Sequence, residues 1–402
     1  MLQETELLSE APSVSSCPRV ELVEDPGTFA SLRAEWSALL ERSDAAVFLA
    51  WEWLYPWYRR IAPDRALRLL VARDRDGRLA GVLPLCEERR RALGRPVRRW
   101  AFLGETHVGS DGLGVIAERG REDALYRLFA AWLLEHASAW DVLELTDLES
   151  GSPALAALRD AFGRTHRVEQ SDRHLCPFEV LHPGETFDAF LRRCGRRENF
   201  LRRLKWLAAQ PGFRLERSER PGDLAVPLGE LFRLHHARWA ADGGSQGIRG
   251  PRVEAFHRDA TEWLAERGKV RLYTLWVGER AVASVYALLH RGELLYFQSG
   301  YDPQWRSKSV GLVLVGETFR DAIEGGLRGY DFLRGTERYK SEWTSRLRRT
   351  VAVRIHPRRG AGAWWCRRQD AARAVRALIK RALPARLVEL IRRLRRRASA
   401  LR

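Results

Sequence analysis

Residues 270–302 constrain the fold more than any other stretch of the sequence. They form three apolar segments separated by the tight turns VGERA and HRGEL. Apolar strands joined by such turns pair as an antiparallel meander. A helical pattern follows from about Ser309 and ends at Gly325-Gly326, because glycine commonly terminates helices. RGYDFLRG and TVAVRIHP then predict two further strands.

The first half of the chain has a fainter version of the same order. The segment LRLLVARDRDGRLAGVLPLCEERR predicts a hairpin with Gly77 in its turn. A helix (DALYRLFAAWLLEHA) and a buried strand (WDVLELTDL) follow it. The shared order predicts an α+β protein with two copies of one fold. We expect a disordered leader over 1–16, domains over 17–181 and 182–356, and a basic helical tail over 357–402.

Composition excludes several classes of protein. A chain of 402 residues with 45% hydrophobic residues and 15 Trp is too apolar to be disordered. The acidic start has no apolar core of a signal peptide, and no apolar run is long enough to span a bilayer, so we expect a cytoplasmic protein. The five cysteines are scattered and form no C-x-x-C pair, which indicates reduced thiols. His235 and His236 are adjacent, which is poor spacing for shared ligation, so no metal is expected.

The net charge of +17 is unevenly placed. From His356 to Arg402 there are 15 Lys and Arg against 2 Asp and Glu, a balance of 15 − 2 = +13. The first 355 residues therefore carry only 17 − 13 = +4. Apolar positions recur at helical spacing through the tail, with arginines between them. Such a basic amphipathic helix predicts binding to an anionic membrane at its inner face. Nucleic acid, or an acidic patch on the same protein, are the competing partners.

One short segment, YDFLRGTERYKSEWTS, gathers an acid, a phenol, an amine and an indole. Glu337, Tyr339, Lys340 and Trp343 fall within seven residues. These groups suit either a surface turn with a salt bridge or a strand end that delivers catalytic groups to a cleft. Asp331, flanked by Tyr330 and Phe332 on the opposite strand face, either faces a cleft or caps a turn.

The segments RAVASVYALLHRGELLYFQSGYDPQW and GYDFLRGTERYKSEW together resemble the GNAT acyltransferase superfamily. They are similar in particular to its CelD/BcsL-like (BioF2-like) branch, which is related to the FemAB-type tandem transferases. The resemblance covers residues 20–355 and is strongest over 196–345. It implies two tandem GNAT-like domains, a mixed and mostly antiparallel sheet flanked by helices, and acyl transfer to an amine.

The resemblance also implies roles for residues of the short segment. Aminolysis of a thioester needs a base, a donor to the oxyanion and an acid for the leaving thiolate. Glu337 is expected to be the base, Tyr339 the acid and Lys340 the anion holder, with Asp331 as a further catalytic candidate.

The donor is expected to be acyl-CoA, with acetyl-CoA as the first choice. Its pyrophosphate would bind at the start of the helix near Ser309, where Arg306, Lys308 and Gly311 also lie. The family's phosphate loop reads Q/R-x-x-G-x-G/A, and no second glycine follows Gly311 in phase. An aminoacyl-tRNA donor, as in FemAB-type proteins, therefore stays open, and nucleic acid is expected only in that role. Tyr301 is either a donor contact or a core aromatic.

Further residues are expected to contact the acceptor, which we take to be a small molecule or a polysaccharide precursor. Arg196 and Asn199 lie on one face of a basic helix that could equally be a solvated surface. The other acceptor candidates are Arg238, Asp302 and Trp343. The loop GETHVGSDGLGVI could bring His107 and Asp111 to a cleft between the domains, but we do not count them among the expected site residues. A non-catalytic accessory protein of exopolysaccharide or cellulose synthesis is the remaining alternative.

Overall fold

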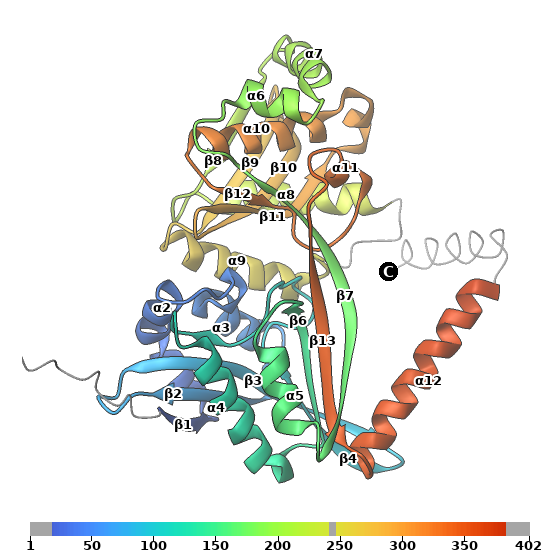
Figure 1. Ribbon diagram of the computed structural model, residues 1–402. Helices are drawn as coiled ribbons and strands as arrows, with labels where there is room; N and C mark the ends of the chain where they lie inside the picture. Colours follow the sequence, from blue (N-terminus) through green and yellow to red (C-terminus); the bar gives the residue numbers. More distant parts are fainter. Residues whose placement is uncertain (1–17, 241–246, 383–402) are drawn as a thin grey trace, which may run out of the picture.

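The structure is a computed structural model that describes residues 18–240 and 247–382. The predicted leader over 1–16 and the last part of the predicted tail, 383–402, lie outside the described residues. Two groups of strands and helices are stacked one above the other in Figure 1. The long strands β7 (His166–Val180) and β13 (Leu347–Pro357) run side by side between them.

The lower group in Figure 1 is built from the first half of the chain, which we call the first repeat. Its strands are β1 (Arg19–Val23), β2 (Ala66–Arg73), β3 (Leu79–Ala92), β4 (Arg95–Phe102), β5 (Ile116–Ala117) and β6 (Val142–Glu149). Its helices are α1 (Pro26–Ser31), α2 (Arg33–Glu41), η1 (Val47–Leu49), α3 (Trp51–Arg60), α4 (Glu122–Glu135), η2 (Ala137–Ala139) and α5 (Ala154–Phe162).

The upper group contains the second repeat, preceded by the helices α6 (Phe187–Arg193) and α7 (Arg197–Ala208). Its strands are β8 (Arg214–Ser218), β9 (Val270–Val277), β10 (Arg280–His290), β11 (Glu293–Tyr301) and β12 (Gly329–Asp331). Its helices are α8 (Ala225–Ala240), α9 (Pro251–Ala265), η3 (Pro303–Lys308), α10 (Val310–Glu324) and α11 (Arg338–Ser341). The predicted meander and the helix after it are thus confirmed.

The two repeats share one continuous mixed sheet within the described part of the chain. Its order is β1-β2-β3-β4-β6-β13-β7-β12-β11-β10-β9-β8, with β5 beside β3. Counted inward from one edge, the strands are β1, β2, β3, β4, β6 and then β13. Counted inward from the other edge, they are β8, β9, β10, β11, β12 and then β7, so the two halves correspond strand by strand. In each repeat one pair is parallel, β4 with β6 and β11 with β12. This symmetry bears out the expected repetition of one α+β fold.

Each repeat gives its last strand to the sheet of the other. Strand β13 pairs with β6 of the first repeat over Thr350–Ile355. Strand β7 pairs with β12 of the second repeat over Phe178–Val180. The two exchanged strands also pair with each other along most of their length. The last strand of the predicted 182–356 domain therefore lies in the sheet of the predicted 17–181 domain.

Buried aromatic side chains join the repeats where α9 packs on α3. The rings of Trp53 and Phe256 lie 4.9 Å apart edge to face, and those of Trp51 and Trp263 lie 5.4 Å apart. Such aromatic pairs bury large apolar areas in a fixed geometry. The part of the interface between α3 and α9 is therefore packed.

Glycines fix two local features of the second repeat. Gly326 adopts a φ of +67° just past the end of α10, so the predicted stop signal is confirmed. Gly300 in β11 lies against the backbone of α8, where a Cβ would come within 2.3 Å of the His235 nitrogen. Only glycine permits this close approach of strand and helix.

Helix α12 (Ala361–Ala382) leaves the lower group and projects away from the body (Figure 1). Its first turns are anchored, because Ala363, Trp365 and Cys366 are buried against β3, β4 and β6. No helix in the described ranges is both long and apolar enough to cross a bilayer.

Candidate active site

The parallel strands β11 and β12 separate after a short pairing. They pair from Glu293 to Leu295 on β11, and the last partner on β12 is Asp331. Beyond this point β11 continues to Tyr301 while β12 ends. Neighbouring strand residues point to opposite faces, and here Leu295 and Tyr296 line different cavities. The opening between the strands therefore lies between two cavities.

The smaller of these, the narrow cavity, has a volume of about 200 Å³ and lies between β11 and α10. Its wall includes the predicted residues Arg238, Tyr301, Gly311, Tyr339 and Trp343. Strand β10, helix α8 and the segment around α11 complete it. The lining residues that the sequence reasoning did not select include Ser284, Tyr296, Ser299, Leu312 and Glu342. Five predicted site residues from four separate segments thus meet in one place.

The start of α10 forms one end of the narrow cavity. Ser309 precedes the helix with a φ of +60° and its side chain makes no capping hydrogen bond. The first N–H groups of a helix have no partner within the helix and attract anions. A Cβ on Gly311 would meet no atom within 4 Å, so space is open beside the first turn. The corresponding helix of the first repeat, α4, instead begins with Glu122 and Asp123, and these carboxylates would repel an anion.

Cations and indoles flank this helix start on the outside. Lys308 places its ammonium 4.6 Å from the ring centroid of Trp206 on α7. The ring of Trp305 lies 6.5 Å from that of Trp206. Arg306 is exposed beside them, and Arg203 reaches the Ser307 carbonyl at 3.5 Å. The surface outside the narrow cavity is therefore basic and aromatic.

Tyr339 is the predicted acid, and its phenol is deep in the wall of the narrow cavity. Burial raises the pKa of Tyr339 well above its usual value, and the neighbouring Tyr296 and Glu337 act in the same direction. The guanidinium of Arg238 opposes this and lies 5.8 Å from the Tyr339 ring and 5.3 Å from the Tyr301 ring. Tyr339 therefore remains protonated at neutral pH and can act as a hydrogen-bond donor.

Glu337 and Lys340 do not line the narrow cavity. The buried Lys340 ammonium donates to the Arg334 carbonyl at 2.7 Å and the Gly335 carbonyl at 3.4 Å. It also lies 3.0 Å from the carboxylate of the half-exposed Glu337. These contacts close the loop before α11. Both residues thus hold the loop that carries Tyr339, and their predicted roles toward reacting groups stay predictions.

Other predicted residues also have structural contacts. The buried Asp302 caps η3 by accepting from the Gln304 N–H at 3.0 Å, and lies 2.5 Å from Arg280. Arg196 binds the Glu342 carbonyl at 3.0 Å and its carboxylate at 3.1 Å. Through Glu342, Arg196 touches the wall of the cavity.

Two more predicted residues, Asn199 and Trp343, make contacts outside the cavity. Asn199 accepts from Arg202 on the surface of α7. Trp343 is buried, and its ring stacks on that of Phe319 at 5.1 Å, so it forms part of the core as well as the cavity wall.

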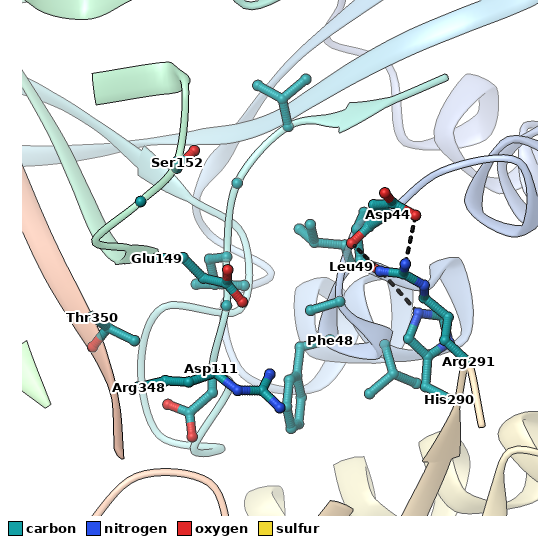
Figure 2. A pocket seen from close by; sticks show the side chains of 18 of the residues that line it. Asp44, Phe48, Leu49, Asp111, Glu149, Ser152, His290, Arg291, Arg348 and Thr350 are labelled. Carbon is teal, nitrogen blue, oxygen red and sulfur yellow. Dashed lines mark hydrogen bonds and ion pairs between the residues drawn. The ribbon is translucent and has the colours of Figure 1, made fainter. Parts of the chain in front are cut away.

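The second space, the wide cavity, has a volume of about 850 Å³ and lies between the repeats. Figure 2 shows Asp44, Phe48 and Leu49 on one wall beside His290 and Arg291, with Asp111, Glu149 and Arg348 across from them. The acidic lining residues are Asp44, Asp111, Glu122, Asp123, Glu149, Glu293 and Asp331, and the arginines are Arg291, Arg328, Arg348 and Arg349. Acids therefore outnumber arginines on its walls.

Asp331 faces the wide cavity at the opening between β11 and β12. Its carboxylate accepts from the Leu333 N–H at 2.7 Å and lies 3.3 Å from Arg348. It therefore does both of the things predicted for it, facing a cleft and capping a turn. Burial raises the pKa of Asp331 to about 6, although Arg348 pulls it down. A carboxylate with this pKa is mostly ionised at pH 7 and can still accept a proton.

The loop of the first repeat that contains Asp111 reaches the wide cavity. Asp111 lines the wide cavity and binds Arg334, which lies between Asp331 and Tyr339 in the sequence. His107 from the same loop does not line either cavity. No group of three or more His, Cys, Asp or Glu side chains in residues 18–240 and 247–382 could hold a metal ion.

Sequence reasoning missed Glu342 and Arg348. Glu342 follows Tyr339 by three residues, a spacing that places both on one side of a helical turn, and this signal could have been used. Arg348 lies in an exchanged strand, and nothing in the local sequence points to its contact with Asp331.

Comparisons with known proteins agree with this architecture. The family described as the acetyltransferase (GNAT) domain matches residues 195–341, which include the narrow cavity and the loop after β12. No curated protein matches the sequence.

Two solved structures share the fold over most of the chain. The crystal structure of FemX is 13% identical, with a TM-score of 0.56, and the match covers 79% of this chain and 95% of that one. The C-terminal domain assigned to a lysylphosphatidylglycerol synthetase of Agrobacterium fabrum is 12% identical, with a TM-score of 0.53, and the match covers 84% and 94%. Residues 195–341 thus match the acetyltransferase (GNAT) domain family, within a chain that shares the fold of FemX over most of its length.

Proposed function

We propose that this protein is an N-acyltransferase that moves an acyl group, with acetyl as the first choice, from acyl-CoA to an amino group. The acceptor is a small molecule or a polysaccharide precursor. The observation that carries the proposal is the early end of the β11–β12 pairing, because Leu295 and Asp331 at that point line the wide cavity while the adjacent Tyr296 lines the narrow one. A donor and an acceptor can meet there from opposite sides.

The narrow cavity suits the thin arm of an acyl-CoA better than a whole nucleotide. Sites for complete ligands usually measure about 300–1,000 Å³, whereas this one measures about 200 Å³. The pyrophosphate would lie at the first turn of α10, near Gly311 and Lys308. The adenine would lie outside, on the surface that Trp206 and Trp305 form, since bases stack on indoles.

The wide cavity suits an amine acceptor. Its walls carry seven acidic side chains against four arginines, and this excess attracts an ammonium group. The ammonium would first give one proton to solvent, and the neutral amine would attack the thioester carbonyl. Asp331 would take the second proton from the attacking nitrogen. The new C–N bond forms as the C–S bond breaks, and Tyr339 gives its proton to the leaving thiolate. The proton on Asp331 returns to Tyr339 through solvent.

Isothermal titration of the purified full chain with acetyl-CoA tests the donor assignment. Gly311→Leu fills the open space beside α10 and should abolish binding without loss of fold. Gly229→Leu is the matched control, because Gly229 also lies in a helix with nothing within 4 Å of its Cβ but lines neither cavity. The assignment fails if acetyl-CoA does not bind, or if Gly311→Leu binds it as wild type does.

Aminoacyl transfer from charged tRNA is the second candidate. Its support is the exposed basic and aromatic surface around Trp206, Arg203 and Lys308, which fits an RNA end as well as it fits a nucleotide. Filter binding with charged and uncharged tRNA decides between the two. Tight binding of charged tRNA together with no binding of acetyl-CoA would replace the first proposal by the second.

A further inference from the structure

The outward face of α12 carries apolar side chains that nothing in the described chain covers. Trp364, Val375 and Leu378 are 54%, 52% and 64% exposed. At about 100° per residue, these three and Ala371 fall within roughly 60° of one another on the helix. On the opposite side, Cys366 is buried against the body and fixes the helix there. The stripe is therefore held pointing away from the protein.

A glycine on the same inner side of α12 brings the helix close to the sheet. Gly362 is buried, and a Cβ at this position would come within 2.2 Å of the Asp141 carbonyl oxygen. The start of the helix thus lies directly on the backbone that leads into β6. This contact fixes which face of α12 is turned outward.

Arginines border this apolar stripe. Arg367 and Arg368 lie on its two sides and are exposed, and no ion pair of either is found within residues 18–240 and 247–382. Arg376 is exposed on the same helix. Ile379, also 52% exposed, extends the apolar surface toward the end of the helix. An apolar centre with cationic flanks is typical of helices that lie in a membrane interface.

The hairpin between β3 and β4 lies beside α12. Leu93 at its tip is 72% exposed with a φ of +50°, and Arg91 and Arg95 beside it are exposed. A groove of about 630 Å³ separates the hairpin from α12. The groove is lined by seven arginines (Arg65, Arg90, Arg91, Arg99, Arg368, Arg373 and Arg376) and by three glutamates (Glu88, Glu105 and Glu144). The excess of cations fits phosphate groups.

We propose that α12 and the β3–β4 hairpin form a docking surface for anionic phospholipid bilayers. Leu93, Trp364, Val375, Leu378 and Ile379 would enter the interface, while the arginines would bind lipid phosphates. This inference does not depend on the proposed reaction.

Two other occupants fit the surface less well. A second copy of the chain packed on the same stripe would bring Arg367 and Arg368 close to their equivalents, and like charges in contact repel. A nucleic acid would pair with the arginines but would leave the aliphatic side chains of Val375, Leu378 and Ile379 without an apolar partner. The lipid interface is the partner that uses both kinds of side chain.

Vesicle flotation of the full chain tests the proposal. Wild type should bind vesicles of equal phosphatidylglycerol and phosphatidylcholine, and should not bind phosphatidylcholine alone. The triple variant Trp364→Ser, Val375→Ser, Leu378→Ser should lose binding by about tenfold or more. Val226→Ser with Leu347→Ser is the matched control, because these residues are 69% and 51% exposed elsewhere and the control should bind as wild type does.

A charge variant tests whether the arginines beside the apolar stripe contribute to vesicle binding. Arg367→Glu with Arg368→Glu should also lose vesicle binding, and acetyl-CoA binding should be unchanged in all of these variants. If the apolar triple variant binds vesicles as well as wild type does, the apolar contact is absent and the proposal fails. The proposal also fails if tRNA competes fully with vesicles for wild type, or if light scattering shows a dimer that the triple variant abolishes without any vesicle binding by wild type.

Discussion

Asp111 and Arg334 join the two repeats next to the candidate site, although they lie 223 residues apart in the sequence. The carboxylate of Asp111 accepts from the Arg334 backbone N–H at 2.8 Å and from its Nε at 2.5 Å. The first repeat thereby holds the loop of the second repeat that carries Tyr339. Burial raises the pKa of Asp111, while the charge of Arg334 lowers it.

Breaking this pair should reduce both stability and turnover. Asp111→Ala leaves the half-buried Arg334 guanidinium with only the more distant Asp147 carboxylate at 3.7 Å, which should cost up to about 3 kcal/mol. Arg334→Ala should have a similar cost, and the double variant should cost less than the sum by about 1–3 kcal/mol. Urea unfolding of the four proteins measures this coupling. Additive costs would show that the two residues do not act together.

Asp331 should control the pH dependence of the reaction. A base with a pKa of about 6 makes kcat/KM rise with pH and level off above neutrality. Asp331→Asn should lower kcat by about 10²–10⁴ without weakening the binding of acetyl-CoA. A profile that stays flat from pH 5 to 8 in the wild type would remove Asp331 from the role of base.

Asp331→Asn should also leave the fold intact. Burial raises the pKa from 3.8 in the unfolded chain to about 6 in the folded one, so the folded state holds the proton more tightly. Stability contributed by this group is therefore present below pH 4 and is lost as pH rises to about 6, by about 3 kcal/mol at most. The variant should be at least as stable as wild type at pH 8, as measured by urea unfolding. A clear loss of stability would mean that the contact with Arg348 outweighs the cost of burial.

Tyr339→Phe should slow the chemical step. The phenol is protonated throughout the neutral range because burial raises its pKa, so its removal takes away a proton donor and should lower kcat about hundredfold. The affinity for acetyl-CoA should change little. Tyr301→Phe is the matched control, since Tyr301 lines the same cavity and should keep most of the activity. Equal loss in the two variants would argue against a special role for Tyr339.

Lys340 should matter for stability, because its ammonium holds two carbonyls of the loop. Lys340→Met should lower the free energy of unfolding by about 2 kcal/mol. Lys340→Arg should not restore it, since the planar guanidinium does not fit the space of a compact ammonium. Thermal unfolding of both variants checks this. A Met variant as stable as wild type, yet inactive, would return Lys340 to the predicted role at the reacting group.

Gly300→Ala should disturb the site through the backbone. The new methyl group would overlap the backbone of α8, and such overpacking costs about 1–3 kcal/mol. Because Arg238 lies on α8 and in the wall of the narrow cavity, binding of acetyl-CoA should weaken as well. Gly229→Ala in the same helix has open space and should be neutral or slightly stabilising. Unchanged stability of Gly300→Ala would contradict the close approach.

Local patterns in the sequence were sufficient to predict most elements of the second repeat. Gly278 and Gly292 in the turns and Gly326 at the helix end all adopt positive φ. Glycine is favoured at such positions, so these glycines marked the ends of the elements in the sequence. The start of a helix near Ser309 could be predicted for a different reason, because apolar residues recur at helical spacing from that point onward. The prediction that Tyr301, Gly311 and Tyr339 belong to one site came from the resemblance to a known fold.

Contacts between distant segments could not be predicted. The exchange of β7 and β13 leaves no trace in either strand, because the alternation of side chains along a strand is the same whichever neighbour it pairs with. The contact between Arg348 and Asp331 follows from that exchange. The sequence spacing allows the Lys340 ammonium to point either into the cavity or toward the carbonyls of its own loop. Which of the two it contacts depends on the path of the loop, which the sequence does not show.

The exchange of the last strands also sets an order of events during synthesis. Strand β6 lacks its neighbour β13 until residues 347–357 have left the ribosome, so the sheet of the first repeat stays open while the second repeat is made. During that time β6 and β7 present unpaired edges, which other chains can join. A fragment that stops after β7 would keep those edges for good. Each repeat therefore needs a strand of the other to complete its sheet, and we expect neither repeat to be stable as a truncated fragment.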